Sequence, residues 1–385
     1  MQAFPVFLAF LCMGFGDVVG PLVGLARDHF HLSNFMATMI PFVGLLMFLI
    51  LSIPMGIYQD KKGKKHVLAL GLTIAMIGLV IPVFGGLESY GLFLFTILLL
   101  GGGMAILQVA GNPVMRDVSP EGKYSRNLSL GQFVKAIGSL SGSLIPVVAA
   151  RWFHAGWDVL FPIYSVSLLI TLIILLSVPI REKKTPDSHP ATFRSSFSLL
   201  KNGFVALMVL GIFLYVGAEL SMSSGIPLYL EDKYGIDIQK LGVAGTGLFF
   251  LALMTGRFFG AVILNWMKAR KFLLLTTILS IAGVLFLISG IRSLAVISII
   301  LIGLSFANVF PLIFSITIDR MPERTNELSG LMITAIVGGA ILPVIMGKIS
   351  DIFNLTAGLL VPLVAILYIL YLAFYIPTSS PKPTL

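Results

Sequence analysis

The sequence predicts an all-α polytopic membrane protein of twelve transmembrane helices, arranged as two pseudo-symmetric six-helix halves. Of its 385 residues, 57% are apolar and only 11% are charged, whereas a soluble globular protein carries about 25% charged residues. Twelve apolar runs are long enough to cross the hydrocarbon layer, which takes about 20 helical residues. The composition therefore excludes a soluble enzyme, a disulfide-built secreted module and a disordered scaffold.

Short polar segments separate the apolar runs, with one longer exception at 181–202, REKKTPDSHPATFRSSFSLLKN. This segment predicts a cytoplasmic linker between an N-terminal half, 1–180, and a C-terminal half, 203–385. The predicted spans lie near 3–26, 36–58, 66–86, 91–116, 128–150, 158–180, 203–229, 241–264, 272–290, 294–318, 328–349 and 356–377.

The placement of basic residues predicts the orientation. If both termini face the cytoplasm, 18 of the 26 lysine and arginine residues lie in cytoplasmic loops and six in outer loops. Cytoplasmic loops of membrane proteins carry such an excess. We therefore expect both termini in the cytoplasm and a lipid bilayer as the surrounding partner. On this interpretation the net charge of +9 reflects basic residues in the loops, which set the orientation of the protein in the membrane. We therefore expect no nucleic acid partner.

The two halves resemble each other as repeats. Asp17 and Glu219, each in the first span of its half, are 202 residues apart, and so are Pro120 and Pro322, both of which precede a glutamate. Repeated halves of this kind are typical of secondary transporters, whose substrate site lies between the halves near the bilayer midplane.

The loop after the second span combines glycines, an acid and a run of lysines. It reads GIYQDKKGKK, with Gly56, Asp60 and Gly63 at its key positions, and a degenerate second copy begins at Gly256-Arg257. In one interpretation the loop is a conformational latch, in which Asp60 pairs with a basic group or a helix terminus and favours one state. The alternative is an ordinary cytoplasmic turn rich in positive charge.

Several longer motifs occur in a fixed order along the chain. They are GGGMAILQVAGNP at 101–113, NLSLGQFVKAIG at 127–138, YVGAE at 215–219 and FPLIFS at 310–315. The lysine-rich loop resembles the cytoplasmic signature of the major facilitator superfamily. The ordered motifs together resemble the fucose–proton symporter family of that superfamily, which includes L-fucose and glucose/galactose permeases. The resemblance implies import of a monosaccharide with a proton or sodium ion, by alternating access, across the bacterial inner membrane.

The resemblance also implies roles for individual residues. Asp17, followed four residues later by Pro21, matches the family's proton-linked aspartate, Gln108 matches a glutamate or glutamine of the fourth helix, and Gln132 matches a sugar-contacting glutamine. The chain departs from the family where Gly16, Lys135 and Phe306-Ala307 replace asparagine or an asparagine–serine pair.

Ionisable residues inside the spans are few. An ionisable side chain at the centre of a membrane helix costs about 2.5–3.5 kcal/mol on insertion scales, so those that occur are usually functional. Asp17 is our candidate for cation coupling, with a structural pair to Lys135 as the alternative. Glu219 either loads a cation as well or holds the C-terminal half together.

Uncharged polar residues in the spans are candidates for sugar binding. Side-chain amides donate and accept hydrogen bonds, as sugar hydroxyls require. The alternative is hydrogen bonding between helices, worth about 0.6 kcal/mol per bond. The predicted substrate-binding residues are Gln108, Asn112, Gln132, Lys135, Tyr215, Asn308 and Phe310.

Lys135 raises a question of charge. It follows Gln132 by three residues, so both project to nearly the same helix face. An ammonium group in a low-dielectric cavity must find an anion. The anion is either Asp17 or Glu219, which we favour, or the substrate, which would then be an acidic sugar.

We therefore predict a monomeric secondary transporter and not an enzyme. It needs no cofactor beyond the coupling proton or sodium ion, and its five histidines form no pattern typical of a metal site. A transporter of acidic sugars, an exporter of amphiphiles and a non-transporting sugar sensor remain as alternatives.

Overall fold

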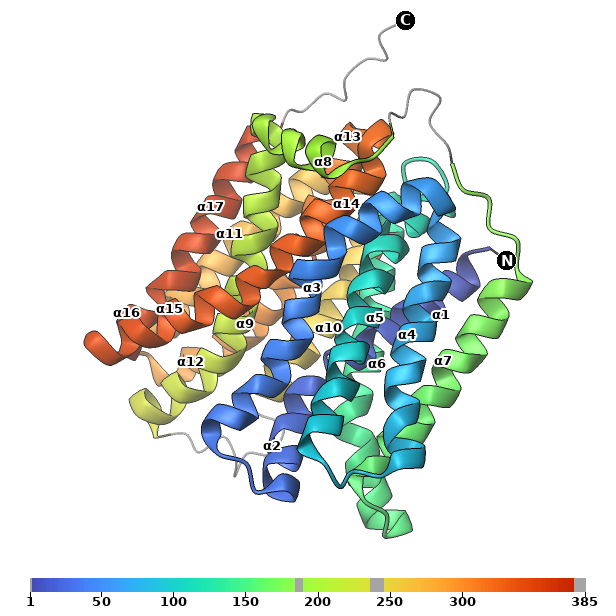
Figure 1. Cartoon of the computed structure of the whole chain (residues 1–385). Coiled ribbons are helices and arrows are strands. Elements are labelled where there is room, and N and C mark those ends of the chain that lie inside the picture. Colours follow the sequence, from blue (N-terminus) through green and yellow to red (C-terminus); the bar gives the residue numbers. More distant parts are fainter. Residues whose placement is uncertain (1, 184–189, 236–245, 377–385) are drawn as a thin grey trace, which may run out of the picture. The chain divides into compact units, whose positions relative to one another are not determined.

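A computed structural model describes residues 2–183, 190–235 and 246–376 (Figure 1). Regular structure in these residues is entirely helical. Ten of the described helices are long and apolar enough to cross a membrane, and Ala3–Gly16 and Gly247–Ile263 are shorter apolar helices at two further predicted spans. The predicted fold class is confirmed. The beginning of the predicted span 241–264 and the last residue of 356–377 lie outside the described residues.

The first predicted span is broken at its centre. It consists of α1 (Ala3–Met13), a 3₁₀ turn η1 (Gly14–Gly16) and α2 (Val19–Phe30). A side chain at Gly14 would overlap the carbonyl of Lys135, and one at Gly138 would overlap the carbonyl of Leu11. Glycine at these two positions therefore lets the broken helix contact α6 (Tyr124–Phe153) backbone to backbone.

By their internal contacts the residues form two compact units. Unit 1 comprises Met1–Pro120, Val134–Ser198 and Glu323–Thr334, and unit 2 comprises Glu121–Phe133, Leu199–Pro322 and Ala335–Leu385. Two short segments, 121–133 and 323–334, thus pack with the unit formed mainly by the other half of the chain. The predicted halves, 1–180 and 203–385 with a linker at 181–202, divide the chain by sequence and not by contacts. This division stays a prediction.

Unit 1 is built around α5 (Tyr90–Asp117), which packs against α1, α3 and α4 and against α14. The glycine run in α5 serves this packing, because a side chain at Gly101 would lie 2.7 Å from the backbone of Gly44, and one at Gly103 would lie 2.6 Å from Ala75. Besides α1, η1, α2 and part of α6, the helices of the unit are α3 (Asn34–Lys62), α4 (Lys64–Gly85), η2 (Trp157–Val159), α7 (Leu160–Ser177), α8 (Phe193–Ser198) and α14 (Thr325–Thr334).

Unit 2 is built around α9 (Gly203–Tyr234), which packs against α13, α15 and α17. Two of its predicted spans are interrupted: α12 (Arg292–Phe306) is followed by α13 (Val309–Arg320), and α15 (Gly338–Ile352) is preceded by the 3₁₀ turn η6 (Ala335–Val337). The other helices here are η3 (Leu199–Lys201), α10 (Thr246–Ile263), α11 (Ala269–Ile288), α16 (Leu355–Gly358) and α17 (Leu360–Tyr375), and η5 (Pro322–Arg324) joins α13 to α14.

Large apolar side chains cover much of the outer surface. Phe84, Trp266 and Phe35 are among the most exposed. A soluble protein rarely exposes extended apolar patches, whereas lipid-facing helices do so along their length. The exposed apolar residues therefore agree with a protein that sits in a bilayer.

Candidate functional site

Asp17 lies just after the break in the first span. Its Oδ2 atom accepts a hydrogen bond of 2.7 Å from Ser139 Oγ and lies 3.3 Å from Lys135 Nζ. The Asp17 side chain is 46% exposed and the Lys135 side chain 13%. The internal ion pair that the sequence predicts for Lys135 is therefore present, and its acid is Asp17.

The local sequence explains how this pair forms. Lys135 and Ser139 are four residues apart on α6 and so share one face. The close glycine contacts at Gly14 and Gly138 bring that face against the broken helix. A side chain at Gly16 would lie 2.8 Å from Met104, so the asparagine expected there from the family could not enter without displacing that methionine.

Three polar residues predicted to bind sugar in the N-terminal half are all buried. Gln108 and Asn112, one turn apart on α5, are both buried. Gln132, on the part of α6 that belongs to unit 2, is also buried, and its carbonyl accepts a long hydrogen bond of 3.5 Å from Arg257 Nη1. Sugar contact by these three residues stays a prediction.

Glu219 in unit 2 also has a basic partner. Its Oε1 atom lies 3.6 Å from Arg257 Nη2, and the two side chains are 15% and 11% exposed. Arg257 Nε also donates to the carbonyl of Ala307 at 3.4 Å. Arg257, a predicted latch residue, lies beside Glu219 in the middle of α10, and its role in the latch stays a prediction.

The break between α12 and α13 organises this part of unit 2. It releases the carbonyls of Phe306 and Ala307 from regular helix bonding, and released carbonyls inside a membrane protein need other donors. The Tyr215 hydroxyl donates to Phe306 at 2.8 Å, and the Asn308 amide donates to the Gly256 carbonyl at 2.7 Å. Tyr215 and Asn308 thus hold helices together, and their predicted contact with substrate stays untested.

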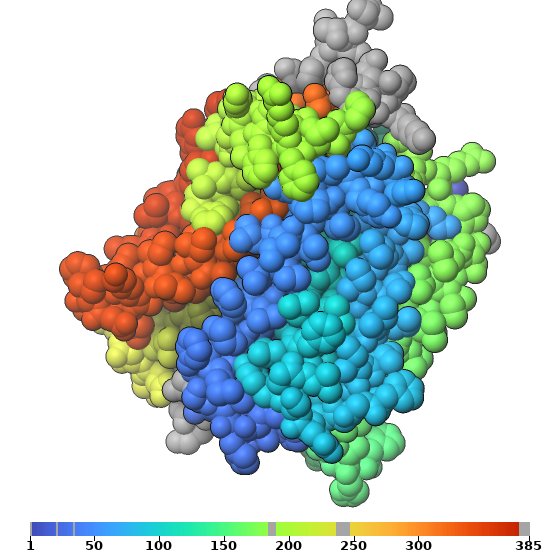
Figure 2. All heavy atoms as spheres, in the orientation of Figure 1, coloured from blue at the N-terminus to red at the C-terminus, as the bar shows by residue number. Residues whose placement is uncertain are grey.

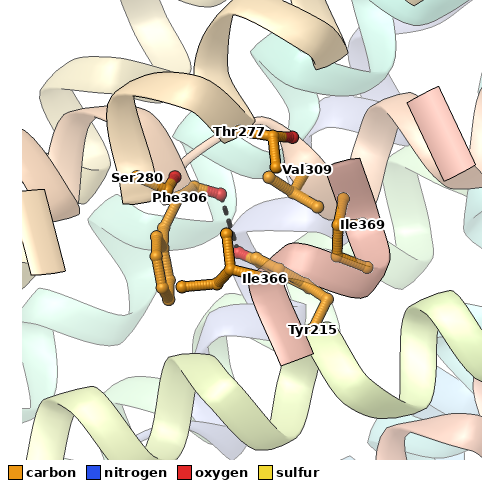
Figure 3. Close-up of a pocket in the computed structure, with 7 residues that line it drawn as sticks. All are labelled: Tyr215, Thr277, Ser280, Phe306, Val309, Ile366 and Ile369. Atoms are coloured by element: carbon orange, nitrogen blue, oxygen red, sulfur yellow. Dashed lines mark hydrogen bonds between the residues drawn. The ribbon is translucent and has the colours of Figure 1, made fainter. Parts of the chain in front are cut away.

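A small cavity lies beside Tyr215 (Figure 3). Its volume of about 10 Å³ is room for one water molecule and far too small for a sugar. The cavity is lined by Tyr215, Thr277, Ser280, Phe306, Val309, Ile366 and Ile369.

Phe310, another predicted substrate residue, is buried and packs against Phe314 with ring centroids 5.7 Å apart.

The predicted latch residue Asp60 lies at the end of α3 and contacts two other segments of unit 1. Its Oδ1 atom accepts from Asn326 Nδ2 at 2.9 Å, in the first turn of α14, and its Oδ2 atom accepts from the Ala191 backbone at 3.0 Å. A side chain at Gly56 would lie 2.8 Å from the Asn326 carbonyl. Asp60 thus accepts from a side-chain amide and from a backbone N–H group, and its role as a latch stays a prediction.

Gly63 makes the turn between α3 and α4. Its φ of +89° lies in the region that favours glycine. The carboxylate of Glu182 accepts from the backbone N–H groups of Lys64 and Lys65, each at 2.9 Å, and so caps the start of α4. Lys64 Nζ in turn lies 2.6 Å from Asp117 Oδ2 in a buried pair.

Several partners in this region are not predicted from the sequence. Ser195 donates to Glu327, which also pairs with Arg324 at 3.0 Å. Helix α8, which carries Ser195, packs on α3 and α14 (Figure 2, yellow-green beside blue). The acid–base spacing Arg324-x-x-Glu327 is a local signal for the Arg324–Glu327 pair. Nothing in the linker sequence marks Ala191 or Ser195 as a partner.

A metal site is not formed by the described residues, in which no three His, Cys, Asp or Glu side chains are grouped to hold a metal ion. The chemistry they offer is that of two acid–base pairs within apolar spans. Ten long apolar helices define a polytopic membrane protein, and ion pairs inside apolar spans are typical of transporters.

Comparison with known proteins assigns the family. The sequence profile described as Major Facilitator Superfamily matches residues 6–342, and the chain belongs to this superfamily. It is 32% identical to a putative glucose/galactose transporter of Helicobacter pylori, covering 94% of each protein, and 25% identical to the L-fucose-proton symporter of Escherichia coli, covering 84% of this chain and 81% of the relative. The resemblance stated from the motifs is thereby confirmed.

A solved structure supports the fold. The transporter FucP in the outward conformation superposes with a TM-score of 0.85 at 20% identity, covering 98% of this chain and 100% of that one. The protein is thus a multi-pass membrane transporter with the major facilitator fold, in a family of transporters.

Proposed function

We propose that the protein imports a neutral monosaccharide together with a proton, by alternating access across the bacterial inner membrane. The observation that carries this proposal is the half-exposed Asp17 carboxylate paired with Lys135 in a broken span. The names of the relatives, a glucose/galactose transporter and an L-fucose-proton symporter, support a hexose or deoxyhexose as the substrate. They lend no support to an amphiphile exporter or a non-transporting sensor.

The pair beside Asp17 supports a proton as the coupling ion. Protonation neutralises the carboxylate and weakens its attraction to the Lys135 ammonium, so a single proton changes the interactions within unit 1. A hard metal cation prefers several oxygen ligands, whereas Asp17 Oδ2 is approached by a serine hydroxyl and an ammonium group. An ammonium group beside this oxygen disfavours a second cation there, since like charges repel.

The balance of charge supports a neutral sugar. Asp17 is matched by Lys135 and Glu219 by Arg257, so each unit keeps its site neutral. An acidic sugar would bring an uncompensated charge into a low-dielectric region, which is costly. The engagement of Lys135 with Asp17 thus argues against the substrate as its anion.

The proposal also covers the membrane in which the protein lies, its orientation there and its oligomeric state. The bias of basic residues supports cytoplasmic termini, and the bacterial relatives support an inner-membrane location. We include a monomer as the transporting species, since each acid finds its base within this chain.

The test is transport by the purified protein in proteoliposomes. An inward proton gradient should drive accumulation of at least one of D-glucose, D-galactose and L-fucose, and an uncoupler should abolish it. A sodium gradient at equal pH should drive none. Matched uronates, D-glucuronate and D-galacturonate, should not compete. Accumulation driven by sodium alone, or competition by the uronates, would contradict the ion or the substrate class respectively.

A further inference from the structure

A wide hollow lies at one end of unit 1. It has a volume of about 960 Å³, and its walls are the end of α2, the turn between α4 and α5, and the connection from α6 to α7. Small-molecule sites typically measure about 300–1,000 Å³. The placement of basic residues predicts that this end of the helices is the outer one. Neither Asp17 nor Lys135 lines the hollow, so it is distinct from the ion pair described above.

Contacts among the three walls fix the shape of this outer hollow. The His29 ring donates from Nε2 to the Leu87 carbonyl at 2.9 Å and lies edge to face with Trp157, with ring centroids 5.9 Å apart. Trp157 also contacts Phe93 and Phe161, with centroids 6.1 and 5.8 Å apart. The three walls are thereby held together before any ligand binds.

The polar lining of the outer hollow is acidic. Its ionisable side chains are His29, His31, Glu88 and Asp158, and its lining residues include no lysine or arginine. Exposed carboxylates are charged at neutral pH. The Asp158 carboxylate turns back over Gly156, whereas Glu88 has no hydrogen-bond or ion-pair partner in the described part of the chain. The outer hollow is therefore complementary to a group that carries positive charge, and Glu88 is the acid that is free to meet it.

The outer hollow adjoins the lipid-facing surface of unit 1. Helices α4 and α7 pack side by side (Figure 1). Val83 and Phe84 are exposed in the last turn of α4, and Ile163 and Val166 are exposed near the start of α7. Val83 also lines the hollow, so the apolar surface and the acidic lining are continuous. A ligand with its charged end in the hollow can lay an apolar part on α4 and α7, where a water-soluble ligand would leave the surface uncovered.

We propose that the outer hollow binds phosphatidylethanolamine, with the ammonium group of the lipid at Glu88 and its acyl chains on α4 and α7. The neighbouring phosphate then meets donors, the ring of His31 and the indole N–H of Trp157, which donates to no described residue. Phosphatidylglycerol has a net negative charge and is repelled by the acids. Phosphatidylcholine carries no N–H group that could donate to Glu88. The bound lipid stabilises unit 1 because it contacts all three walls.

The test is a lipid titration of the detergent-purified full chain, followed by native mass spectrometry. The first phosphatidylethanolamine should bind about fivefold more tightly than phosphatidylglycerol or phosphatidylcholine, the upper end for an exposed ion pair. Glu88→Gln should remove this preference, and Glu88→Lys should reverse it in favour of phosphatidylglycerol. Glu231→Gln makes the matched change at an exposed position of α9 and should keep the preference. Because Glu88 has no partner in the described residues, the lipid-free variants should unfold at the temperature of the wild type.

Competition identifies the occupant. Glycerophosphoethanolamine has the same headgroup without acyl chains and should not displace the lipid at equal concentration. Displacement by it would assign the hollow to a soluble ammonium compound, and displacement by D-glucose, D-galactose or L-fucose would assign it to a sugar; either result would overturn the proposal. Equal affinities for the three lipids, or a preference that survives in Glu88→Gln, would overturn it too. None of these measurements involves transport, so their outcome is independent of the proposed function.

Discussion

Asp17 has surroundings that are unusual for a residue of an apolar span. It sits beyond a 3₁₀ turn, half-exposed, with a hydroxyl and an ammonium on the same oxygen. These contacts stabilise a carboxylate inside a membrane protein, and its exposure lets a proton reach it. Two predictions follow from the pair itself.

The Asp17→Asn variant should lose uphill accumulation of sugar and retain exchange. Asparagine keeps the hydrogen bond to Ser139 but cannot change charge, so the proton gradient no longer acts on the site. Accumulation under a proton gradient and counterflow without one are measured side by side. Asp28→Asn, at an exposed position of α2, is the control. Undiminished accumulation by Asp17→Asn would remove this residue from coupling.

Loss of Lys135 should destabilise the protein through Asp17. Breaking a buried pair by removing one partner costs about 3–5 kcal/mol, and exposed pairs contribute about 0–1 kcal/mol. Because Asp17 is half-exposed, we expect an interaction free energy of about 1 kcal/mol between the residues. Thermal unfolding in detergent of Lys135→Gln, Asp17→Asn and the double variant measures it. Fully additive effects would mean that the pair contributes nothing.

Broken helices are the recurring device among the elements. In unit 1 the break at Gly14–Gly16 positions Asp17, and in unit 2 the break after Phe306 supplies carbonyls to Tyr215 and Arg257. In both places, close helix contact or a side-chain donor compensates for the interrupted helix bonding. The breaks therefore belong to the site as much as the charged residues do.

A side chain at Gly138 should separate the elements that carry the pair. In Gly138→Ala the new methyl group would overlap the Leu11 carbonyl, and overpacking of this kind costs about 1–3 kcal/mol. We expect a lower unfolding temperature and impaired transport. Gly24→Ala, in α2, where nothing lies within 4 Å of an added methyl, is the matched control. Equal stability of the two variants would contradict the close contact.

The contacts of Asp60 tie α3 to the linker and to α14. Replacing its carboxylate in Asp60→Asn weakens the acceptor for both Asn326 and Ala191, since a charged acceptor binds more strongly than an amide. We expect a shifted balance between inward- and outward-open states with nearly unchanged sugar affinity. Labelling of cysteines introduced on either side of the membrane reports the balance, with Asp158→Asn as the control. Unchanged labelling together with normal transport would reduce Asp60 to a loop residue.

For the whole molecule, coupling means that proton and sugar stabilise each other's binding. By thermodynamic reciprocity, a proton that strengthens sugar binding by some factor is itself bound more tightly by that factor when sugar is present. Addition of a transported sugar to the detergent-solubilised protein in weakly buffered solution should therefore cause proton uptake. The uptake should vanish in Asp17→Asn. Its persistence in that variant would place the coupling proton elsewhere.

Some features of the site could be predicted from local pattern. The pair of Lys135 with an acid follows from its place three residues after Gln132 and from the cost of an unpaired ammonium. The packing role of the glycine run at 101–103 follows from its position inside an apolar span. The pairing of Arg257 with Glu219 could not be predicted in this way. A short Gly-Arg motif has the same sequence whether it lies in a loop or in the middle of a helix. Nor could the bonds of Asp60 to Ala191 and of Tyr215 to Phe306 be predicted, which join residues 131 and 91 positions apart.

By itself the sequence predicted the fold class and the family, which are confirmed, and the bias of basic residues predicts an orientation, because hydropathy, helix length and charge bias are properties of short segments. Only the tertiary structure decided which base meets Asp17 and which meets Glu219, and where the spans at Gly14 and Phe306 break. Those outcomes depend on directional contacts whose strength changes within a few tenths of an ångström, and on glycines that admit a neighbouring helix. Such contacts join residues from distant parts of the chain, so no local pattern contains them.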